Sequence, residues 1–443
     1  MGRPCPNNCV WYTYKVVVAV APFARTPRRL LLDRRFGPFV LARLCAGIGV
    51  WIHAPIAAIE MYRLTGSAVW VGLVGVVQFA PQVLLAPILG ILADRGHARL
   101  QIVLGYVVSA VGALLSAPAF GGAALLPVLA LSDAVWLLVG AAVVGIGFSI
   151  GGPAGLAMVA ELVDADEVPA ATQLNSLPLL ISRTAGPALG AVLLAGAGAG
   201  ACFALSGGVN LAAALVMAVL GLPRRLPGAG VAAALGLGTT VRYVLAHREL
   251  GLTLMGIAVV GAASDPSTTL TPILGDRVNA PAAAAGWMAA AFGLGSLLAV
   301  PLVTPLRRWQ GLFGGAALGL ALMAVGLATT AVPLLAAAMA GMTIAGIGMT
   351  VGYTCFSILV QLLSPAAMRA RVFALWIVAF LGLRPIMSLL SGGGVEWVGV
   401  VPVLALVGTG GLAVAARCWV RRGSVTVEPS WAVRDERACK ETS

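Results

Sequence analysis

Charge, histidine and clustered cysteine are all scarce in this chain. Only 10% of its 443 residues are charged and 60% are hydrophobic, whereas soluble domains carry about 25% charged residues. The three histidines stand far apart, and the seven cysteines are scattered through the sequence. No GxxxxGK[ST] motif for ATP hydrolysis occurs. We therefore expect an integral membrane protein that is not an enzyme and that binds no metal and no cofactor.

Long apolar runs make up most of the chain. Their length of about 20 residues is what a helix needs to cross a hydrocarbon core about 30 Å thick. Polar or Gly/Pro breaks divide them into twelve candidate membrane helices, at 37–60, 69–93, 100–121, 134–158, 171–195, 200–221, 250–272, 283–305, 311–331, 334–358, 371–393 and 398–416. The predicted fold class is an all-α membrane protein with twelve transmembrane helices in two six-helix bundles.

The basic residues gather on one side of these helices. With the N-terminus in the cytoplasm, the positive-inside rule is satisfied by both tails and by the cytoplasmic connections, which hold Arg95, Arg99, Arg224, Arg225, Arg242, Arg248, Arg307, Arg308, Arg369 and Arg371. Only Arg63 and Arg277 fall on the other side. We therefore predict cytoplasmic termini and a multi-pass protein of the cytoplasmic (inner) membrane. The net charge of +12 is interpreted as orienting charge, with no nucleic-acid partner.

The longest internal connection divides the chain in the middle. The predicted parts are a basic cytoplasmic N-terminal tail, a six-helix bundle, a cytoplasmic linker, a second six-helix bundle and a C-terminal tail, at 1–35, 36–222, 223–249, 250–418 and 419–443. In the linker, one helical face is apolar, formed by Leu237, Val241, Val244 and Leu245. This pattern fits a short helix on the membrane surface, and it equally fits a plain linker.

An internal repeat supports the division into two halves. Gly145-Ile146-Gly147 in the fourth candidate helix matches Gly346-Ile347-Gly348 in the tenth, 201 residues later. Further matches at offsets of 196 and 198 residues are Pro169-Ala170-Ala171 with Pro365-Ala366-Ala367, and Gly186-Pro187 with Arg384-Pro385. Two such halves, related by an axis along the membrane normal, form one class of transporter.

A short polar loop, Gly90 to Arg99, interrupts the apolar runs after the second candidate helix. It resembles the signature loop of the major facilitator superfamily. Other stretches resemble that superfamily's multidrug and enterobactin-exporter-like branch of drug:proton antiporters, also described as transmembrane secretion effectors. They are Leu64-Thr65-Gly66-Ser67-Ala68 and Arg369-Ala370-Arg371-Val372 with Gly382 and Pro385. The similarity runs from about residue 36 to 415, nearly all of the chain except the tails.

We interpret the loop as a gate formed by Gly90, Asp94, Arg95 and Arg99. A carboxylate at a helix end can accept amide hydrogen bonds and pair with an arginine, and so hold the two halves together. Gly90, one turn earlier, permits close helix packing. The plainer interpretation is that these charges only orient the protein. The family loop usually has one more basic residue than His97-Ala98-Arg99 supplies, and the second-half copy, Thr304 to Arg308, has no acid.

The fifth candidate helix holds Arg183, Gly186, Pro187 and Gly190, which resemble the family's antiporter motif. The resemblance implies export rather than uptake. Arg183 and Arg384 each lie about 12 residues into their helices, or about 18 Å. An arginine near the bilayer midplane costs at least about 2.5–3.5 kcal/mol. Both are therefore candidate substrate contacts, or else hydrogen-bond hubs for carbonyls that the neighbouring prolines leave free.

Proton coupling needs a titratable group inside the pathway. Relatives often carry an acid in the first helix shortly after a glycine, and here none occurs between Gly49 and Glu60. His53 and Asp265 lie at similar depth in corresponding helices, 212 residues apart, and are the candidate coupling residues. Alternatively, His53 caps a local carbonyl, and Asp265 caps a helix break before Pro266.

The sequence thus predicts a secondary active exporter of a small molecule, such as a drug, siderophore or other secondary metabolite. We expect it to work by proton antiport with alternating access and to be a monomer in the lipid bilayer. Its partners would be the small-molecule substrate and protons. The alternatives are an importer of the same fold and a non-transporting membrane receptor or scaffold.

Overall fold

The computed structural model describes residues 27–117, 132–164, 167–223, 237–365 and 368–423. All regular elements in these ranges are helical. The first part of the chain forms α1 (Pro27–Leu31), α2 (Phe36–Thr65), α3 (Ala68–Leu92), the π-helical turn η1 (Ala93–His97), α4 (Ala98–Ser116), α6 (Asp133–Leu162) and α7 (Val168–Val219). The second part forms α9 (Leu237–Ala246), α10 (Arg248–Ala263), α11 (Pro266–Thr269), α12 (Thr271–Arg277), α13 (Ala283–Leu298), α14 (Val300–Thr330), α15 (Leu335–Leu363), α16 (Arg369–Val398) and α17 (Val400–Val420).

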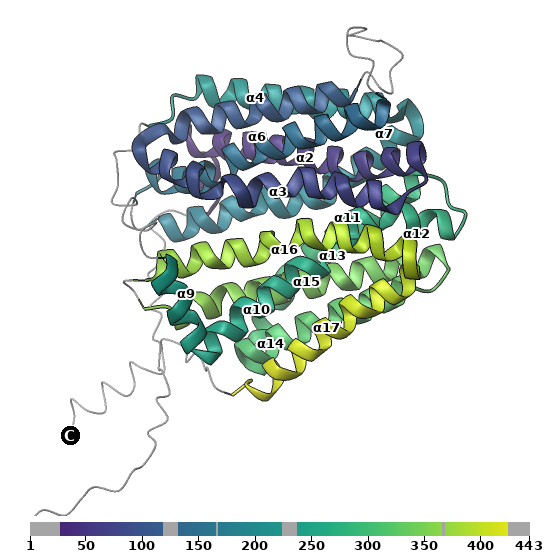
Figure 1. Cartoon of the computed structure of the whole chain (residues 1–443). Helices are drawn as coiled ribbons and strands as arrows, with labels where there is room; N and C mark the ends of the chain where they lie inside the picture. Colours follow the sequence, from purple (N-terminus) through teal and green to yellow (C-terminus); the bar gives the residue numbers. More distant parts are fainter. Residues whose placement is uncertain (1–26, 118–131, 165–166, 224–236, 366–367, 424–443) are drawn as a thin grey trace, which may run out of the picture.

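The helices lie in two groups, stacked one above the other in Figure 1. The first group is α2, α3, α4, α6 and α7, and the second is α10 to α17. Between the groups, α3 packs against α16 and α7 packs against α13. We call the end of the molecule with η1 and α9 the η1 end, and the opposite end, with α12, the α12 end (Figure 1).

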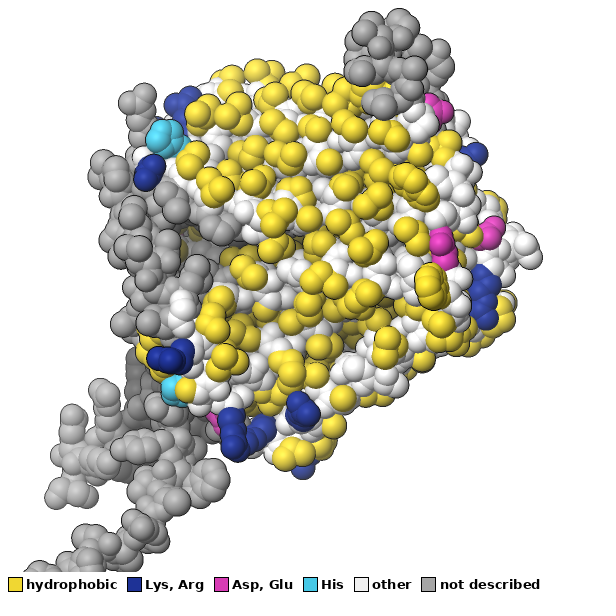
Figure 2. Space-filling model, in the orientation of Figure 1, with side chains coloured by type: hydrophobic (Ala, Val, Ile, Leu, Met, Phe, Trp, Pro, Cys, Tyr) yellow, Lys and Arg dark blue, Asp and Glu magenta, His cyan; other side chains and the backbone are white. Residues whose placement is uncertain are grey.

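Many large apolar side chains of the long helices are exposed. Among the described residues, ten helices are long and apolar enough to cross a membrane, and α13 is a shorter apolar helix. Figure 2 shows hydrophobic side chains over the middle of the visible face and charged side chains mainly towards its two ends and lower edge. Exposed apolar side chains in water would be costly. The fold is therefore that of a multi-pass membrane protein.

Two helices contain a turn instead of ending in a loop. The helix α7 has 52 residues and reverses at Gly198, where φ is 79°, and α14 turns in the same way at Gly311, where φ is 73°. Only glycine adopts this conformation without strain. The spans expected at 171–195 and 200–221 are thus one element with a glycine turn. The span expected at 283–305 is divided between α13 and the start of α14.

The span expected at 250–272 is also broken. It consists of α10, α11 and α12, with Asp265 before Pro266 at the first break and Leu270 before Thr271-Pro272 at the second. Proline in a helix interior removes a backbone hydrogen bond and clashes with the preceding turn. The breaks place irregular backbone in the interior, where Asp265, Ser267 and Thr271 are all buried.

The repeat is visible in the packing. A Cβ atom at Gly145 would lie 2.9 Å from Cα of Gln78 in α3, and one at Gly346 would lie 2.9 Å from the carbonyl carbon of Phe292 in α13. Gly147 and Gly348 pack in the same way against α4 and α14. The matched glycines therefore let equivalent helices approach closely in both groups.

The helix bounds correct part of the repeat alignment. The helices α7 and α16 begin 201 residues apart, at Val168 and Arg369, and the turn at Gly198 recurs 201 residues later at Gly399, with φ of 86°. The prolines matched at offsets of 196 and 198 are therefore not structural equivalents. Arg183 and Arg384, also 201 residues apart, are equivalent.

Candidate functional site

Arg183 lies in α7, where this helix meets the second group. Its side chain is only 5% exposed. The guanidinium lies over the ring of Trp51 in α2, 4.7 Å from the ring centre, and 5.5 Å from that of Phe292 in α13. Gly293 makes this approach possible, because a Cβ there would lie 2.6 Å from Cα of Thr184. Aromatic faces stabilise a desolvated cation, but they do not neutralise it.

Arg384 occupies the corresponding place in α16. It is 3% exposed, and its guanidinium lies 4.4 Å from the ring centre of Phe79 in α3. Each arginine therefore reaches across to a phenylalanine of the other helix group. The two phenylalanines are 213 residues apart, close to the offset between the front parts of the two halves. These reciprocal arginine–phenylalanine contacts repeat the internal symmetry at the interface between the two helix groups, which we call the seam.

Asp265 lies at the break between α10 and α11 and is fully buried. The Ser388 hydroxyl donates a hydrogen bond of 2.5 Å to its Oδ1, and Ser388 Oγ is 3.3 Å from Thr269 Oγ1. Arg384 lies one helical turn before Ser388 in α16, and both Asp265 and Arg183 are close enough to Arg384 to interact with it electrostatically. Three buried charged side chains, from α7, from α16 and from the break between α10 and α11, therefore form one cluster, which we call the central charge cluster.

The central charge cluster is incompletely paired. Among the described residues, no hydrogen-bond partner contacts Asp265 Oδ2, Nε and Nη2 of Arg183, or Nε and Nη2 of Arg384. A buried charge without a partner is costly, and a buried polar atom without one costs about 1–3 kcal/mol. Such atoms are retained where a ligand, water or proton completes them. The cluster is therefore a candidate binding site.

An aromatic cluster adjoins it. Tyr353 in α15 lies edge-on to Trp376 and Phe380 in α16, with ring centres 5.0 Å apart in both cases. Arg183 is close enough to act on Tyr353 electrostatically. Together with Trp51, Phe79 and Phe292, these rings give the cluster apolar walls.

The two candidate coupling residues lie apart. His53 in α2 is buried inside the first group, with Nε2 3.1 Å from Ser116 Oγ in α4 and its ring 5.1 Å from that of Phe203. Among the described residues, Nδ1 of His53 has no partner. Asp265 instead belongs to the central charge cluster.

The motif glycines of α7 are packing residues. A Cβ at Gly186 would lie 2.6 Å from that of Trp51, and Gly190 packs more loosely against Ile56. Pro187 removes the amide that would bond to the carbonyl of Arg183. That carbonyl instead faces Gly293 of α13. The α7 motif thus brings together α2, α7 and α13 around Arg183.

The candidate gating loop forms η1. Gly96 has φ of 91°, and Arg99 donates a hydrogen bond of 3.1 Å to the carbonyl of Ala218 near the end of α7. Arg95 is exposed. The side-chain surroundings at Gly90 and Asp94 lie outside what the structure describes.

At the α12 end, two side-chain contacts join the helix groups. The Tyr62 hydroxyl donates to Oδ2 of Asp276 at 3.2 Å. Glu396 at the end of α16 accepts hydrogen bonds from the Ser67 hydroxyl and, at 3.1 Å, from the amide of Val69 at the start of α3. A carboxylate is favourable at a helix N-terminus. We call these two contacts the α12-end latch.

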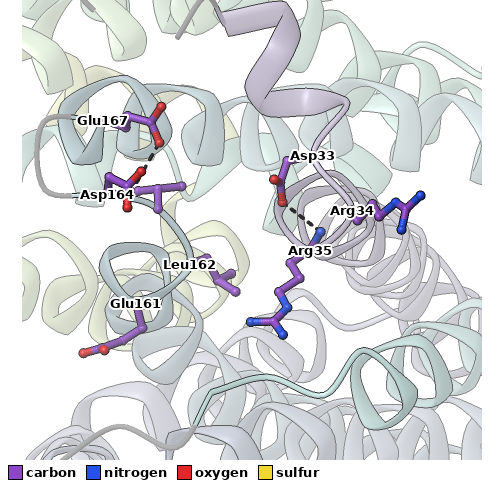
Figure 3. Close-up of a pocket in the computed structure, with 8 residues that line it drawn as sticks. Asp33, Arg34, Arg35, Glu161, Leu162, Asp164 and Glu167 are labelled. Atoms are coloured by element: carbon purple, nitrogen blue, oxygen red, sulfur yellow. Dashed lines mark hydrogen bonds between the residues drawn. The ribbon is translucent and has the colours of Figure 1, made fainter. Parts of the chain in front are cut away.

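Two cavities lie at opposite ends of the molecule. One of about 330 Å³ at the η1 end lies between the starts of α2 and α7 and the end of α6. Figure 3 shows its charged lining, in which Asp33 accepts a hydrogen bond from the amide of Arg35 and Glu167 accepts one from the amide of Asp164. The other, of about 440 Å³, lies beside Tyr62, Asp276 and Gly399. Among the described residues, no group of three or more metal-ligating side chains occurs.

Sequence reasoning missed the partners of the arginines. Phe79, Phe292 and Ser388 look like ordinary membrane-helix residues. The signal that was available is the spacing of 201 residues between Arg183 and Arg384, which equals that of the glycine repeat.

Comparison with known proteins assigns the family. The model of the transmembrane secretion effector family matches residues 28–428, so the chain belongs to this family of the major facilitator superfamily. It is a membrane transport protein. No curated protein matches the chain.

Solved transporter structures share the fold. A bacterial homologue of the human lysosomal transporter Spinster, inward-facing and unoccupied, has 16% identity and a TM-score of 0.66, over 90% of this chain and 97% of that chain. A mutant of the nucleoside transporter NupG has 13% identity and a TM-score of 0.69, over 88% and 100%. A D-xylose-proton symporter has 14% identity and a TM-score of 0.67, over 89% and 100%.

Proposed function

We propose that the protein is a secondary active exporter of a small molecule, such as a drug, siderophore or other secondary metabolite, across the cytoplasmic membrane. It works by alternating access and proton antiport. The observation that carries the proposal is the central charge cluster, in which unpartnered charges of both helix groups meet at the seam. Unpaired charge at the interface between the two helix groups favours the binding of a ligand or a proton there. It disfavours an interface that stays permanently closed.

The proposed topology has twelve crossings in two bundles of six, with both termini in the cytoplasm. The divided helices α7 and α14 each change direction at a glycine turn, and α13 completes a crossing together with the start of α14. The η1 end is then cytoplasmic, which agrees with the position of Arg95, Arg99 and Arg242 there. The α12 end faces outward.

In this orientation the α12-end latch closes the outer side. Glu396 and Asp276 hold α16 and α12 against the first group. Such bonds are few and exposed, so they can break when the groups rock. The η1 loop, with Gly90, Asp94, Arg95 and Arg99, is the proposed latch of the opposite side, with Asp94 as its acid.

Asp265 is one of two candidate proton carriers. Its Oδ1 is held by Ser388, while Oδ2 has no partner among the described residues. A proton on Oδ2 removes the buried negative charge, and loss of that proton leaves a carboxylate that attracts Arg384. Proton binding therefore changes the attraction on an arginine at the seam. His53 is the second candidate, because it is buried and its Nδ1 is free among the described residues.

Inverted membrane vesicles test the function. A panel of labelled antibiotics, siderophores and aromatic acids is offered to energised vesicles that contain the protein, and vesicles without it serve as the control. We expect at least one compound to accumulate inside and to release protons from the lumen. Movement in the opposite direction indicates an importer, and binding without movement indicates a receptor.

A further inference from the structure

The central charge cluster contains more positive than negative charge. Arg183 and Arg384 supply two cations, and Asp265 is the acid that acts on them. The aromatic partners of the arginines, Phe79 and Phe292, carry no charge. With Asp265 ionised the cluster is left with one uncompensated positive charge, and with Asp265 protonated it has two. In a buried site this excess calls for an anion.

The unpartnered atoms lie on both helix groups. Nε and Nη2 of Arg183 belong to the first group, and the same atoms of Arg384 belong to the second. A guanidinium presents its N–H groups in a fork that fits a carboxylate. An anion between the two arginines would therefore bind both groups at once.

The aromatic rings around the arginines indicate to what kind of molecule the negative group belongs. Trp51, Phe292, Phe79 and the adjoining Tyr353 surround the charges with rings. A small, strongly hydrated anion loses much of its hydration in such a site, because the rings offer it no hydrogen bonds. A carboxylate on an aromatic body keeps its ring against apolar walls and leaves only one charged group to be paired.

We propose that the transported substrate is an aromatic monoanion, a carboxylate or similar planar acid, held between Arg183 and Arg384. That the bound anion is transported rests on the proposed function, whereas its binding between the two arginines does not. Asp265 competes with the substrate for Arg384. The substrate and the ionised Asp265 therefore disfavour each other, and protonation of Asp265 favours the bound anion. A proton on Asp265 and the anion would thus travel together, so antiport of such an anion needs its proton on another group, for which His53 is the candidate.

Equilibrium binding to the full-length protein in nanodiscs tests the proposal without any gradient. The probes are radiolabelled naphthoate, neutral naphthol and cationic naphthylmethylamine, which share one ring system. We expect naphthoate to bind about tenfold or more tightly than the other two, since charge-assisted hydrogen bonds are worth about this much. Equal binding of naphthol, or no saturable naphthoate binding by the folded protein, overturns the proposal.

Variants locate the site. Arg384→Gln and Arg183→Gln should each weaken naphthoate about tenfold or more and leave naphthol within about twofold. Arg43→Gln is the matched control, because Arg43 lies in α2 over Phe39 and against Gly155 of α6, both within the first group. Asp265→Asn should tighten naphthoate binding, since it removes the competing carboxylate. Naphthoate affinity that is unchanged in both seam-arginine variants, or weaker in Asp265→Asn, contradicts the proposal.

The binding experiment and the vesicle experiment can fail independently of each other. Selective naphthoate binding with no flux in vesicles supports the site and overturns the exporter. Flux of a neutral or cationic compound without naphthoate selectivity supports the exporter and overturns the substrate class. Arg384→Lys distinguishes the fork from the charge alone, because a lysine keeps the charge but not the paired donors.

Discussion

At the scale of single residues, the rarity of charge in the membrane made the important positions visible. Arg183, Arg384 and Asp265 stand out in the sequence because so few charges occur within the apolar runs. Their partners did not stand out, because Phe79 and Phe292 are ordinary in an apolar helix. Which face of a helix meets which neighbour depends on packing between distant segments. His53 illustrates the same limit, since its depth was evident but not its direction towards Ser116.

Asp265→Asn is the sharpest test of proton coupling. The amide keeps the size of the side chain but cannot exchange a proton, so if Asp265 carries the coupled proton, substrate-linked proton movement should fall to the level of empty vesicles. Binding of naphthoate should persist. A pH-sensitive dye in proteoliposomes measures the first and nanodisc binding the second. His53→Gln is made in parallel, and loss of coupling there with normal coupling in Asp265→Asn would move the proton site to His53.

At the scale of helices, close packing at the seam depends on glycine. Gly293→Ala would place a Cβ 2.6 Å from Cα of Thr184, and backbone atoms cannot turn aside. We expect α13 to be pushed from α7, with a loss of about 1–3 kcal/mol of stability and reduced transport. Thermal unfolding in detergent measures the first effect.

The control is Gly410→Ala in α17, where no atom lies within 4 Å of the added Cβ. Alanine favours a helix over glycine by about 1 kcal/mol, so this variant should be unchanged or slightly more stable. Equal stability of Gly293→Ala and Gly410→Ala would show that the α7–α13 contact is looser than described.

The α12-end latch gives a prediction about access. Glu396→Ala removes the acceptor for Ser67 and Val69, and Tyr62→Phe removes the donor to Asp276. Together they should increase the labelling rate of Ile273→Cys, which lines the adjoining cavity, by a membrane-impermeant maleimide in whole cells. Glu249→Gln, which removes the contact to Arg421 at the other end, is the control. An unchanged rate in the double variant would mean that the latch does not govern opening.

Asp94→Asn tests the proposed inner latch. Since the amide cannot form an ion pair, flux should fall sharply while expression and membrane insertion stay normal. Immunoblots and thermal unfolding check the protein, and vesicle uptake checks the flux. Near-normal flux at normal protein levels would leave the loop with an orienting role only.

The sequence predicted helices better than it predicted their ends. Apolar runs located the long helices, because membrane crossing requires about 20 apolar residues. The sequence did not predict that α7 and α14 turn at Gly198 and Gly311 without a loop. Nothing in the sequence distinguishes a glycine with a positive φ from the other glycines of these stretches. The break at Asp265-Pro266 was foreseen from its proline, whereas the second break, at Leu270 before Thr271-Pro272, was not, although it too lies beside a proline.

At the scale of the whole molecule, the proposed substrate charge predicts an electrical signature. Export of one anion in exchange for one proton moves two positive charges inward per cycle. Each charge crossing 100 mV is worth about 2.3 kcal/mol, so an interior-negative potential should drive export strongly even without a pH gradient. Solid-supported-membrane currents on adding naphthoate measure this.

A potassium–valinomycin clamp at zero potential is the control, and it should reduce export. An export rate that is independent of potential would require a cycle that moves no net charge, such as a monovalent cation exchanged for one proton or an anion that leaves together with a proton. The measurement uses the unsubstituted protein, so no folding defect can mimic the result.

The recurring glycine turn also records ancestry. From Gly145 to Gly198 the chain has as many residues as from Gly346 to Gly399, and both turns adopt nearly the same backbone angles. Earlier in each half the separation is larger, 214 residues between Gly105 and Gly319, which pack in the same way against Gly147 and Gly348. If the halves descend from one duplicated gene, insertions and deletions since then have been accepted only in the front part of each copy. A turn made by one residue cannot absorb an insertion or a deletion, so any change of length there would have rotated the following helix away from its packing partners.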